Sequence, residues 1–312
     1  MVFKVDKITA FLNKNFNNKY SLSELKQDAS LRQYYRISTE QHSYILMDSS
    51  RDQKALLDFV KITNLLQKHE LSVPTIILAD PEHNFLVLED FGTISFNDYL
   101  KQQPNDTDKL YYLALDNINE VVKIKITDLD LKHHNKTELL DGVKLFSKYY
   151  LKENPDILTN MFAQVLAKLN DNHRYLALRD FHADNLMILK HRADLYKIGL
   201  LDYQDASKSF LSYDLISLIQ DARRQVKLLD QKKYLSYFID KAKIKNLSKF
   251  YQEYEILSFQ RNARILGLFT KFTREGSTNY NKYISNVREY LEQNLQSKEL
   301  VEINSYLKKK LI

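Results

Sequence analysis

A short polar loop between two apolar segments carries the side chains best suited to chemistry. Residues 175–189 read YLALRDFHADNLMIL, so one apolar strand runs into the loop and another leaves it. Phosphoryl transfer needs a carboxylate that accepts the proton of the attacking hydroxyl, and an oxygen ligand for a metal that bridges the phosphates. Asp180 suits the first role and Asn185, five positions later, suits the second.

A second acidic side chain ends the next apolar segment. Residues 197–201 read KIGLL and are followed at once by Asp202. An aspartate at a strand tip can hold magnesium between phosphate groups. Alone, a loop aspartate or asparagine is commonly a turn former or a helix cap. Asp180, Asn185 and Asp202, placed along a strand–loop–strand–strand pattern, are together far more specific.

Hydrophobic periodicity divides the chain at Gly92. Before it, helices are expected at 6–17 and 52–69, and strands at 33–38, 43–48, 75–78 and 85–88. After it, helices are expected at 94–101, 107–125, 137–151, 157–173 and from 212 almost to the end, with short strands near 175–178, 186–189 and 197–201. These elements predict an α+β protein with a sheet-rich lobe (residues 1–91) and a larger helical lobe (92–312).

Composition excludes several classes of protein. The 312 residues contain no cysteine, so neither disulfides nor thiolate metal sites are expected. No apolar run of about 18 residues exists, and the N-terminus lacks a secretory pattern, so we expect a cytoplasmic protein with no membrane partner. The net charge is +6, but 46 Lys and Arg are scattered among 40 acidic residues rather than gathered in a patch. A nucleic-acid partner is therefore not expected.

The loop LRDFHADNL (178–186) resembles the catalytic loop of the aminoglycoside-phosphotransferase and protein-kinase-like families. A narrower similarity, to bacterial anomeric kinases of N-acetylmuramate and N-acetylglucosamine, comes from LDYQDA (201–206) and YDLISLIQDAR (213–223). Further matching segments are ASLRQYYR (29–36), ILMD (45–48), FLVLEDFG (85–92) and QRNARILGLF (260–269). The resemblance covers about residues 25–290.

This resemblance implies a protein-kinase-like two-lobed fold, a five-stranded antiparallel sheet in the small lobe, and ATP with Mg²⁺ as cofactors between the lobes. It makes Asp180 the catalytic base, and Asn185 and Asp202 the metal ligands. The implied activity is transfer of the ATP γ-phosphate to a sugar hydroxyl, best the anomeric one of N-acetylmuramate or N-acetylglucosamine in cell-wall recycling. Kinases of other small alcohols (an aminoglycoside, choline or homoserine) are the alternative within the family.

The resemblance also implies the binding residues. Nucleotide would contact the loop that replaces a Gly-rich loop, the strand after it, and the hinge that holds adenine: Ser30, Arg32, Arg36, Leu88 and Asp90. Sugar would contact His182, Gln204, Arg223 and Arg261. Other roles remain open, because His182 suits a packing position, Arg223 suits a solvated helix face and Arg261 suits a surface salt bridge. Asp214, just before an apolar helical run, is expected to be a helix cap.

Two positions depart from the family pattern. Met47 stands where such kinases usually carry a phosphate-binding lysine, and Arg36 or Arg32 is the expected substitute. Leu178 stands where a histidine usually braces the catalytic loop. These departures motivate a rival hypothesis, a nucleotide-binding pseudokinase scaffold, although such a scaffold has no chemical need for Asp180, Asn185 and Asp202 together.

Overall fold

A computed structural model describes residues 2–25, 32–169 and 174–310. Within them the chain forms two compact units, which are described separately. Unit 1 comprises Met1–Ile94 and Met187–Gln204, and unit 2 comprises Ser95–Leu186 and Asp205–Ile312. None of the helices in the described part of the chain is both long enough and apolar enough to span a membrane.

Unit 1 is built on a five-stranded antiparallel sheet with the order β1-β2-β3-β5-β4. Its elements are α1 (Val2–Phe16), β1 (Ser21–Glu24), β2 (Gln33–Ser38), β3 (Ser43–Asp48), α2 (Gln53–Lys68), β4 (Ile76–Asp80), β5 (Phe85–Glu89) and β8 (Ile198–Leu200). A further strand, β7 (Leu186–Ile188), pairs with β8 and begins where the chain enters this unit. The antiparallel five-stranded sheet predicted from the sequence is confirmed.

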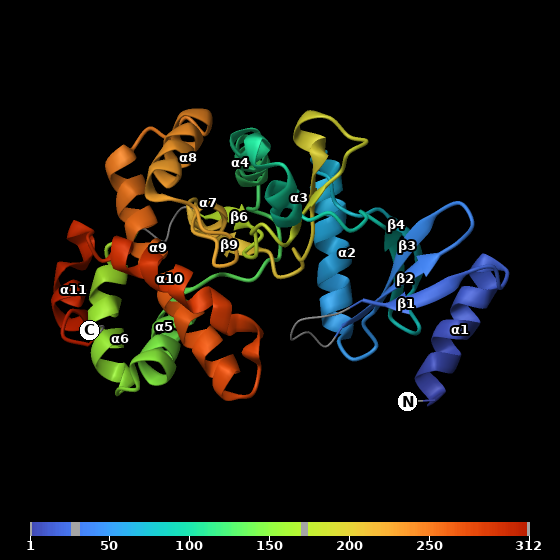
Figure 1. Cartoon of the computed structure of the whole chain (residues 1–312), viewed down its shortest axis with the longest axis horizontal. Coiled ribbons are helices and arrows are strands. Elements are labelled where there is room, and N and C mark those ends of the chain that lie inside the picture. Colours follow the sequence, from blue (N-terminus) through green and yellow to red (C-terminus); the bar gives the residue numbers. More distant parts are fainter. Residues whose placement is uncertain (1, 26–31, 170–173, 311–312) are drawn as a thin grey trace. The chain divides into compact units, whose positions relative to one another are not determined.

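Alternation along β3 decides which face of the sheet receives each side chain. Leu46 packs with Val87 and with Ile8 and Leu12 of α1, so α1 covers that face (Figure 1). Successive strand residues point to opposite faces. Met47, fully buried, therefore points to the face opposite α1. A lysine at this position would have to be buried there as well.

Tyr203 ties the C-terminal end of unit 1 to α2. Its ring stacks on Phe59 with centroids 5.2 Å apart, and its hydroxyl lies 2.9 Å from Thr63 Oγ1. Because Thr63 donates its own hydrogen to the Phe59 carbonyl at 2.7 Å, Tyr203 is the donor to Thr63. The residue next to Asp202 is therefore anchored in a buried contact.

Unit 2 is mostly helical. Its elements are α3 (Phe96–Gln102), α4 (Thr107–Lys123), α5 (Lys136–Leu145), α6 (Pro155–Leu166), β6 (Tyr175–Ala177), β9 (Ser207–Ser209), α7 (Tyr213–Ile219), α8 (Leu228–Lys241), α9 (Leu247–Arg274), α10 (Asn281–Asn294) and α11 (Val301–Leu307). The long helix α9 packs against α5, α7 and α10. Gly267 permits this approach, because a Cβ there would lie 2.4 Å from the backbone nitrogen of Phe146.

The predicted helices and strands of both units are found with shifted ends. The expected strand at 175–178 is β6, and it pairs antiparallel with β9, a strand that the sequence did not indicate. Part of the helix expected at 157–173 falls on residues 170–173, which lie outside the described residues. Gly92 has φ of +83°, the left-handed conformation that glycine adopts without a Cβ penalty, as suits a hinge.

Two substitutions test the Tyr203 anchor. Thr63→Val removes the acceptor of a buried hydroxyl and should lower the free energy of unfolding by about 1–3 kcal/mol. Tyr203→Phe leaves Thr63 bonded to Phe59 and should cost only about 0.5–1.5 kcal/mol. Urea unfolding followed by circular dichroism measures both. An equal or reversed order of the two losses would contradict the assigned direction of the hydrogen bond.

Candidate active site

The loop that contains Asp180 is held through its backbone by buried carboxylates of unit 2. The N–H groups of Leu178 and Arg179 donate to the two oxygens of Asp214 at 2.6 and 2.8 Å. Arg179 has φ of +74°, an unfavourable conformation for a residue with a Cβ, which these bonds help to maintain. The helix cap predicted at Asp214 is wrong, because Ser212 holds the N-cap position of α7 and Asp214 binds the loop instead.

Asp221 also accepts a hydrogen bond from the backbone of this loop, at Ala183. One of its oxygens accepts the Ala183 N–H at 2.8 Å and the other accepts the Arg223 N–H at 2.8 Å. The side chain is fully buried, as an unexposed carboxylate with several hydrogen bonds can be. With its backbone fixed on both sides, the loop presents Asp180 as an exposed residue. Sequence reasoning missed the loop contacts of both Asp214 and Asp221, because nothing local marks a carboxylate that acts more than 30 residues away.

Asn185 closes the loop with its side-chain amide. Its Nδ2 donates to the Asp180 carbonyl at 3.0 Å and lies 3.3 Å from His182 Nε2. This orientation turns the carbonyl oxygen of the amide, the atom a metal would use, away from both acceptors. Because Nε2 of His182 accepts this hydrogen bond, the proton of the neutral ring resides on Nδ1.

His182 is a neutral hydrogen-bond donor in a positive environment. Burial, reinforced by Arg223 and Arg261, lowers its pKa well below the ordinary value. Only 5% of the residue is exposed, and Nδ1 has no hydrogen-bond partner among the described residues. A buried donor of this kind is costly unless a partner arrives. The predicted role of His182 as a substrate ligand remains a prediction, and this geometry favours it over simple packing.

The two arginines predicted to contact substrate occupy different environments. Arg223 Nε lies 3.5 Å from Asp184, whose other oxygen accepts from Asn97 at 2.9 Å. Arg261 is only 4% exposed and donates to the Gln220 carbonyl at 3.2 Å. Neither lies on a solvated helix face. Arg223 is the more accessible of the pair, and both raise the positive potential beside His182.

Asp202 of unit 1 lies at a turn with an unfavourable backbone conformation. Asp202 has φ of +57°, and its side chain is 45% exposed. Gln204 Nε2 donates to Asp202 Oδ1 at 2.8 Å, and Arg32 Nη2 lies 3.5 Å from the same oxygen. The buried Oε1 of Gln204 has no partner among the described residues. Asp202 is thus oriented by an amide and a guanidinium, with Tyr203 fixed beside it.

The side chain of Arg36 binds Asp90 and Gly92, in the segment predicted to be the hinge. Its guanidinium donates to both oxygens of Asp90 at 2.6 and 3.1 Å and to the Gly92 carbonyl at 3.0 Å. Burial alone would raise the pKa of Asp90, but the hydrogen bonds from Arg36 and Gly92 hold it below the ordinary value. Of the two arginines expected to replace the missing lysine, Arg32 is therefore the one beside Asp202. Leu88 is buried in β5, and Ser30 lies outside the described residues.

The donor set suits a hard divalent cation. Mg²⁺ takes oxygen ligands, and it commonly uses one or two carboxylates together with water and substrate phosphates. The Asp202 carboxylate and the Asn185 amide oxygen are of this kind. No cluster of three His, Cys, Asp or Glu side chains able to hold a metal occurs among the residues described. Each of these two oxygens is chemically suited to magnesium, and their role as its ligands remains a prediction.

Chain connectivity relates the two sets of residues. The chain passes from unit 2 to unit 1 between Leu186 and Met187, and returns between Gln204 and Asp205. Asn185 lies one residue before Leu186, the last residue ahead of the first crossing, and Asp202 lies two residues before Gln204, the last residue ahead of the second. Asn185 thus lies in unit 2 just before the chain enters unit 1, and Asp202 lies within the unit 1 segment, near its end.

Known proteins resemble this chain along most of its length. The family described as "Phosphotransferase enzyme family" matches residues 21–241. A protein of Neisseria meningitidis serogroup B named N-acetylmuramate/N-acetylglucosamine kinase is 26% identical, covering 87% of this chain and 85% of its own. A protein of the same name from Pseudomonas putida is 25% identical, covering 89% and 87%.

Solved structures agree on the fold. The ADP-bound aminoglycoside phosphotransferase APH(2'')-Ib aligns with a TM-score of 0.61 at 16% identity, covering 91% of this chain and 96% of its own. Choline kinase LicA from Streptococcus pneumoniae aligns with a TM-score of 0.65 at 14% identity, covering 93% and 99%. At such identities the likeness concerns the fold alone, and it confirms the predicted protein-kinase-like architecture.

The hydrogen bonds that Asp214 accepts from the loop predict that the activity falls at acidic pH. Burial raises the pKa of Asp214 to about 7, and protonation would turn one of its two acceptor oxygens into a hydroxyl. Turnover should therefore fall as the pH drops through about 7. Asp214→Asn also lacks one acceptor, so it should lose about ten- to a hundred-fold in kcat at high pH and show no limb near pH 7.

The measurement is kcat between pH 5.5 and 8.5 for the native protein, Asp214→Asn and the exposed control Asp205→Asn. The control should keep the native profile. An acid limb of native shape in Asp214→Asn would show that another group causes it.

Proposed function

The chain belongs to the phosphotransferase enzyme family, and within it we propose a kinase that transfers the ATP γ-phosphate to the anomeric hydroxyl of N-acetylmuramate or N-acetylglucosamine. The observation that carries this proposal is the loop with Asp180 and Asn185, clamped by Asp214 and Asp221, in a chain similar along most of its length to proteins named for that activity.

Asp180 is proposed to act as the base of this reaction. Its exposed carboxylate would accept the proton of the sugar hydroxyl while that oxygen bonds to the γ-phosphorus. The bond from the γ-phosphorus to the β–γ bridging oxygen breaks, and ADP leaves with that oxygen. Bound magnesium would neutralise charge on the phosphates, and Asn185 and Asp202 are the residues that would hold it.

The nucleotide is proposed to use groups of unit 1. The backbone from Leu88 to Phe91 would bind adenine, and the Arg36–Asp90 pair would keep that segment in shape. Arg32, beside Asp202, would supply the positive charge that a lysine at position 47 supplies elsewhere in the family. Such charge neutralisation is a major part of catalysis in phosphoryl transfer.

The charges near the loop favour a neutral or anionic sugar. His182 offers a neutral N–H donor, and Gln204 offers an acceptor, as sugar hydroxyl or amide groups require. Arg223 could pair with a lactyl carboxylate of N-acetylmuramate. A polycationic aminoglycoside would instead be repelled by Arg223 and Arg261. We place this reaction in the cytoplasm, as a step of cell-wall recycling, and propose no nucleic-acid partner.

The first test measures ADP release with ATP and magnesium on N-acetylmuramate, N-acetylglucosamine, kanamycin and choline. We expect turnover on the amino sugars. Asp180→Asn should lower kcat by about a hundred- to ten-thousand-fold, as loss of a general base does. Asp205→Asn, a carboxylate paired with Lys132 outside the loop, is the matched control and should remain active.

Each other outcome of this assay has a definite meaning. Turnover on kanamycin or choline alone would move the acceptor to that class while keeping Asp180 as the base. ATP binding without transfer to any acceptor would favour the pseudokinase hypothesis and contradict the proposal.

The magnesium ligand gives an independent test. Asp202→Asn keeps the size of the side chain but weakens its attraction for a divalent cation. The magnesium concentration for half-maximal activity should rise about tenfold or more, since a charge-assisted contact is worth roughly 1.5–3 kcal/mol. Titration of activity with MgCl₂ at fixed ATP measures this, and an unchanged magnesium requirement would exclude Asp202 as a ligand.

A further inference from the structure

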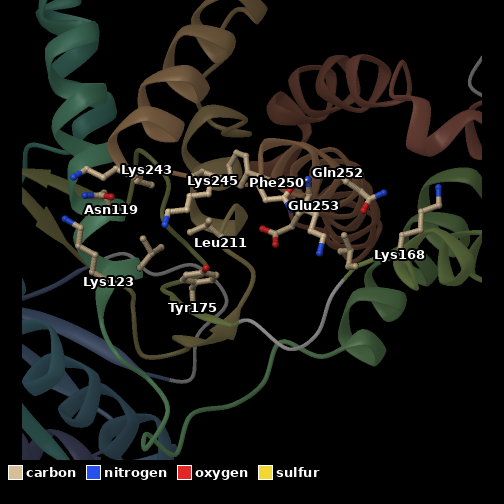
Figure 2. A pocket seen from close by; sticks show the side chains of 16 residues that line it. Asn119, Lys123, Lys168, Tyr175, Leu211, Lys243, Lys245, Phe250, Gln252 and Glu253 are labelled. Carbon is tan, nitrogen blue, oxygen red and sulfur yellow. Dashed lines mark hydrogen bonds between the residues drawn. The ribbon is translucent and has the colours of Figure 1, made fainter.

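Helix α9 binds the short helix α7 at both of its ends. Before α7, Glu253 accepts the N–H and the hydroxyl of Ser212 at 2.9 and 2.8 Å. Figure 2 shows the Glu253 side chain beside Leu211, the residue that precedes Ser212. After α7, Arg261 donates to the carbonyl of Gln220 at 3.2 Å. The backbone of α7 is therefore fixed against α9 on both sides of the helix.

Arg261 is a buried cation with a fixed position. It is only 4% exposed, so it has little access to a ligand from solvent. Its neighbour Asn262 donates to Gln220 Oε1 at 2.6 Å, so two consecutive residues of α9 hold the same residue of the α7 terminus. Among the residues that the structure describes, no carboxylate oxygen lies within 4.0 Å of the Arg261 guanidinium. Its charge therefore acts on the carboxylates around it at longer range.

The charge of Arg261 acts on two acidic groups at once. Asp214 binds the N–H groups of Leu178 and Arg179 from a buried position. Burial raises its pKa to about 7; the charge of Asp180 adds to this rise, whereas the loop N–H groups and Arg261 oppose it. Two neighbouring carboxylates resist being ionised together, and a nearby cation reduces that resistance.

We propose that Arg261 positions the loop that contains Asp180, as the buried counter-charge that lets Asp214 bind this loop as a carboxylate while Asp180 is also ionised. The role of Asp180 in this assignment rests on the proposed function. Burial lowers the pKa of Arg261, but Tyr213, Asp221 and Asp180 raise it. A guanidinium stays protonated at neutral pH even inside a protein, so the counter-charge is permanent.

The other arginines of the loop region serve other carboxylates. Arg179 Nη2 lies 3.8 Å from Glu138. Arg223 lowers the pKa of Asp221, through its backbone N–H and through its charge, more than Arg261 does. Loss of Arg261 should therefore be felt mainly at Asp214.

Two further ionisable groups lie near α7 and cannot replace Arg261. His134 packs edge-on against Tyr213 with ring centroids 4.6 Å apart, and it is neutral at ordinary pH because burial lowers its pKa to about 3. Arg264, three residues along α9, opposes the charged form of Arg261. Its charge acts against the Arg261 guanidinium rather than together with it.

The pH dependence of kcat tests the assignment. Arg261→Gln removes the charge, so Asp214 should take up its proton at higher pH, and the fall of kcat at acidic pH should move up by about one pH unit. At pH 7 this variant should be about fivefold slower than the native protein, and at pH 9 within about twofold of it. Arg261→Lys keeps the charge and should keep the fall within about 0.3 units of its native position. Arg288→Gln, at an exposed arginine paired with Glu292, is the matched control and should behave like the native protein.

Other roles of Arg261 give different results. A purely structural role would lower kcat by the same factor at every pH. A direct contact with the acceptor would raise the KM for the amino sugar and leave the pH of the fall unchanged. Either result, or an equal shift in Arg261→Gln and Arg261→Lys, would overturn the assignment.

Urea unfolding at pH 9, where Asp214 is ionised, supplies a readout that needs no acceptor. Arg261→Gln should lower the free energy of unfolding, and this loss should be about half as large in the Asp214→Asn background, because interacting residues are not additive. If Arg261→Gln alone does not fold, the double variant should fold, since the carboxylate leaves with its counter-charge. Equal losses in both backgrounds, or a double variant that does not fold, would overturn the assignment. Reduced loss in a native chain without turnover would support the pairing and overturn only the proposed function.

Discussion

The loop that contains Asp180 has no regular secondary structure, so its backbone N–H groups must find acceptors elsewhere in the fold. Two buried carboxylates of unit 2 meet this demand. Asp214 binds the Leu178 and Arg179 N–H groups, and Asp221 binds the Ala183 N–H. A buried carboxylate is tolerated only when hydrogen bonds compensate for its lost hydration. The loop and the two acids therefore stabilise each other, and the exposed position of Asp180 depends on both.

In unit 1 an unfavourable backbone conformation has to be stabilised at Asp202. Its left-handed φ is unfavourable for a residue with a side chain. The next residue, Tyr203, is fixed by stacking on Phe59 and by its bond to Thr63. The exposed carboxylate of Asp202 thus lies next to a residue whose side chain is fixed and buried. In unit 2, Asp180 likewise lies next to Arg179, whose backbone N–H is bound by Asp214. Preorganisation of this kind matters because phosphoryl transfer depends mainly on positioning and electrostatics.

The two departures from the family pattern have a physical account within this framework. Leu178 cannot brace the loop with a side-chain hydrogen bond, but its backbone N–H is held by Asp214, and its side chain is buried. Met47 leaves β3 without a cation, while Arg32 brings a guanidinium to 3.5 Å from Asp202. Arg36, the other expected substitute, is bound by Asp90 and Gly92 at the hinge. The charge is thus available from another position of unit 1.

The sequence by itself determined the elements and indicated the candidate reactive side chains, because helix and strand periodicity and the types of residues 180, 185 and 202 are local properties. It indicated the antiparallel sheet, the helical lobe and the hinge at Gly92. Strand β9, the loop contacts of Asp214 and Asp221, and the binding of Arg36 by Asp90 and Gly92 were decided only by the tertiary structure. Each of these joins residues distant in the chain, and a short segment of sequence carries no record of the partner that folding will bring to it.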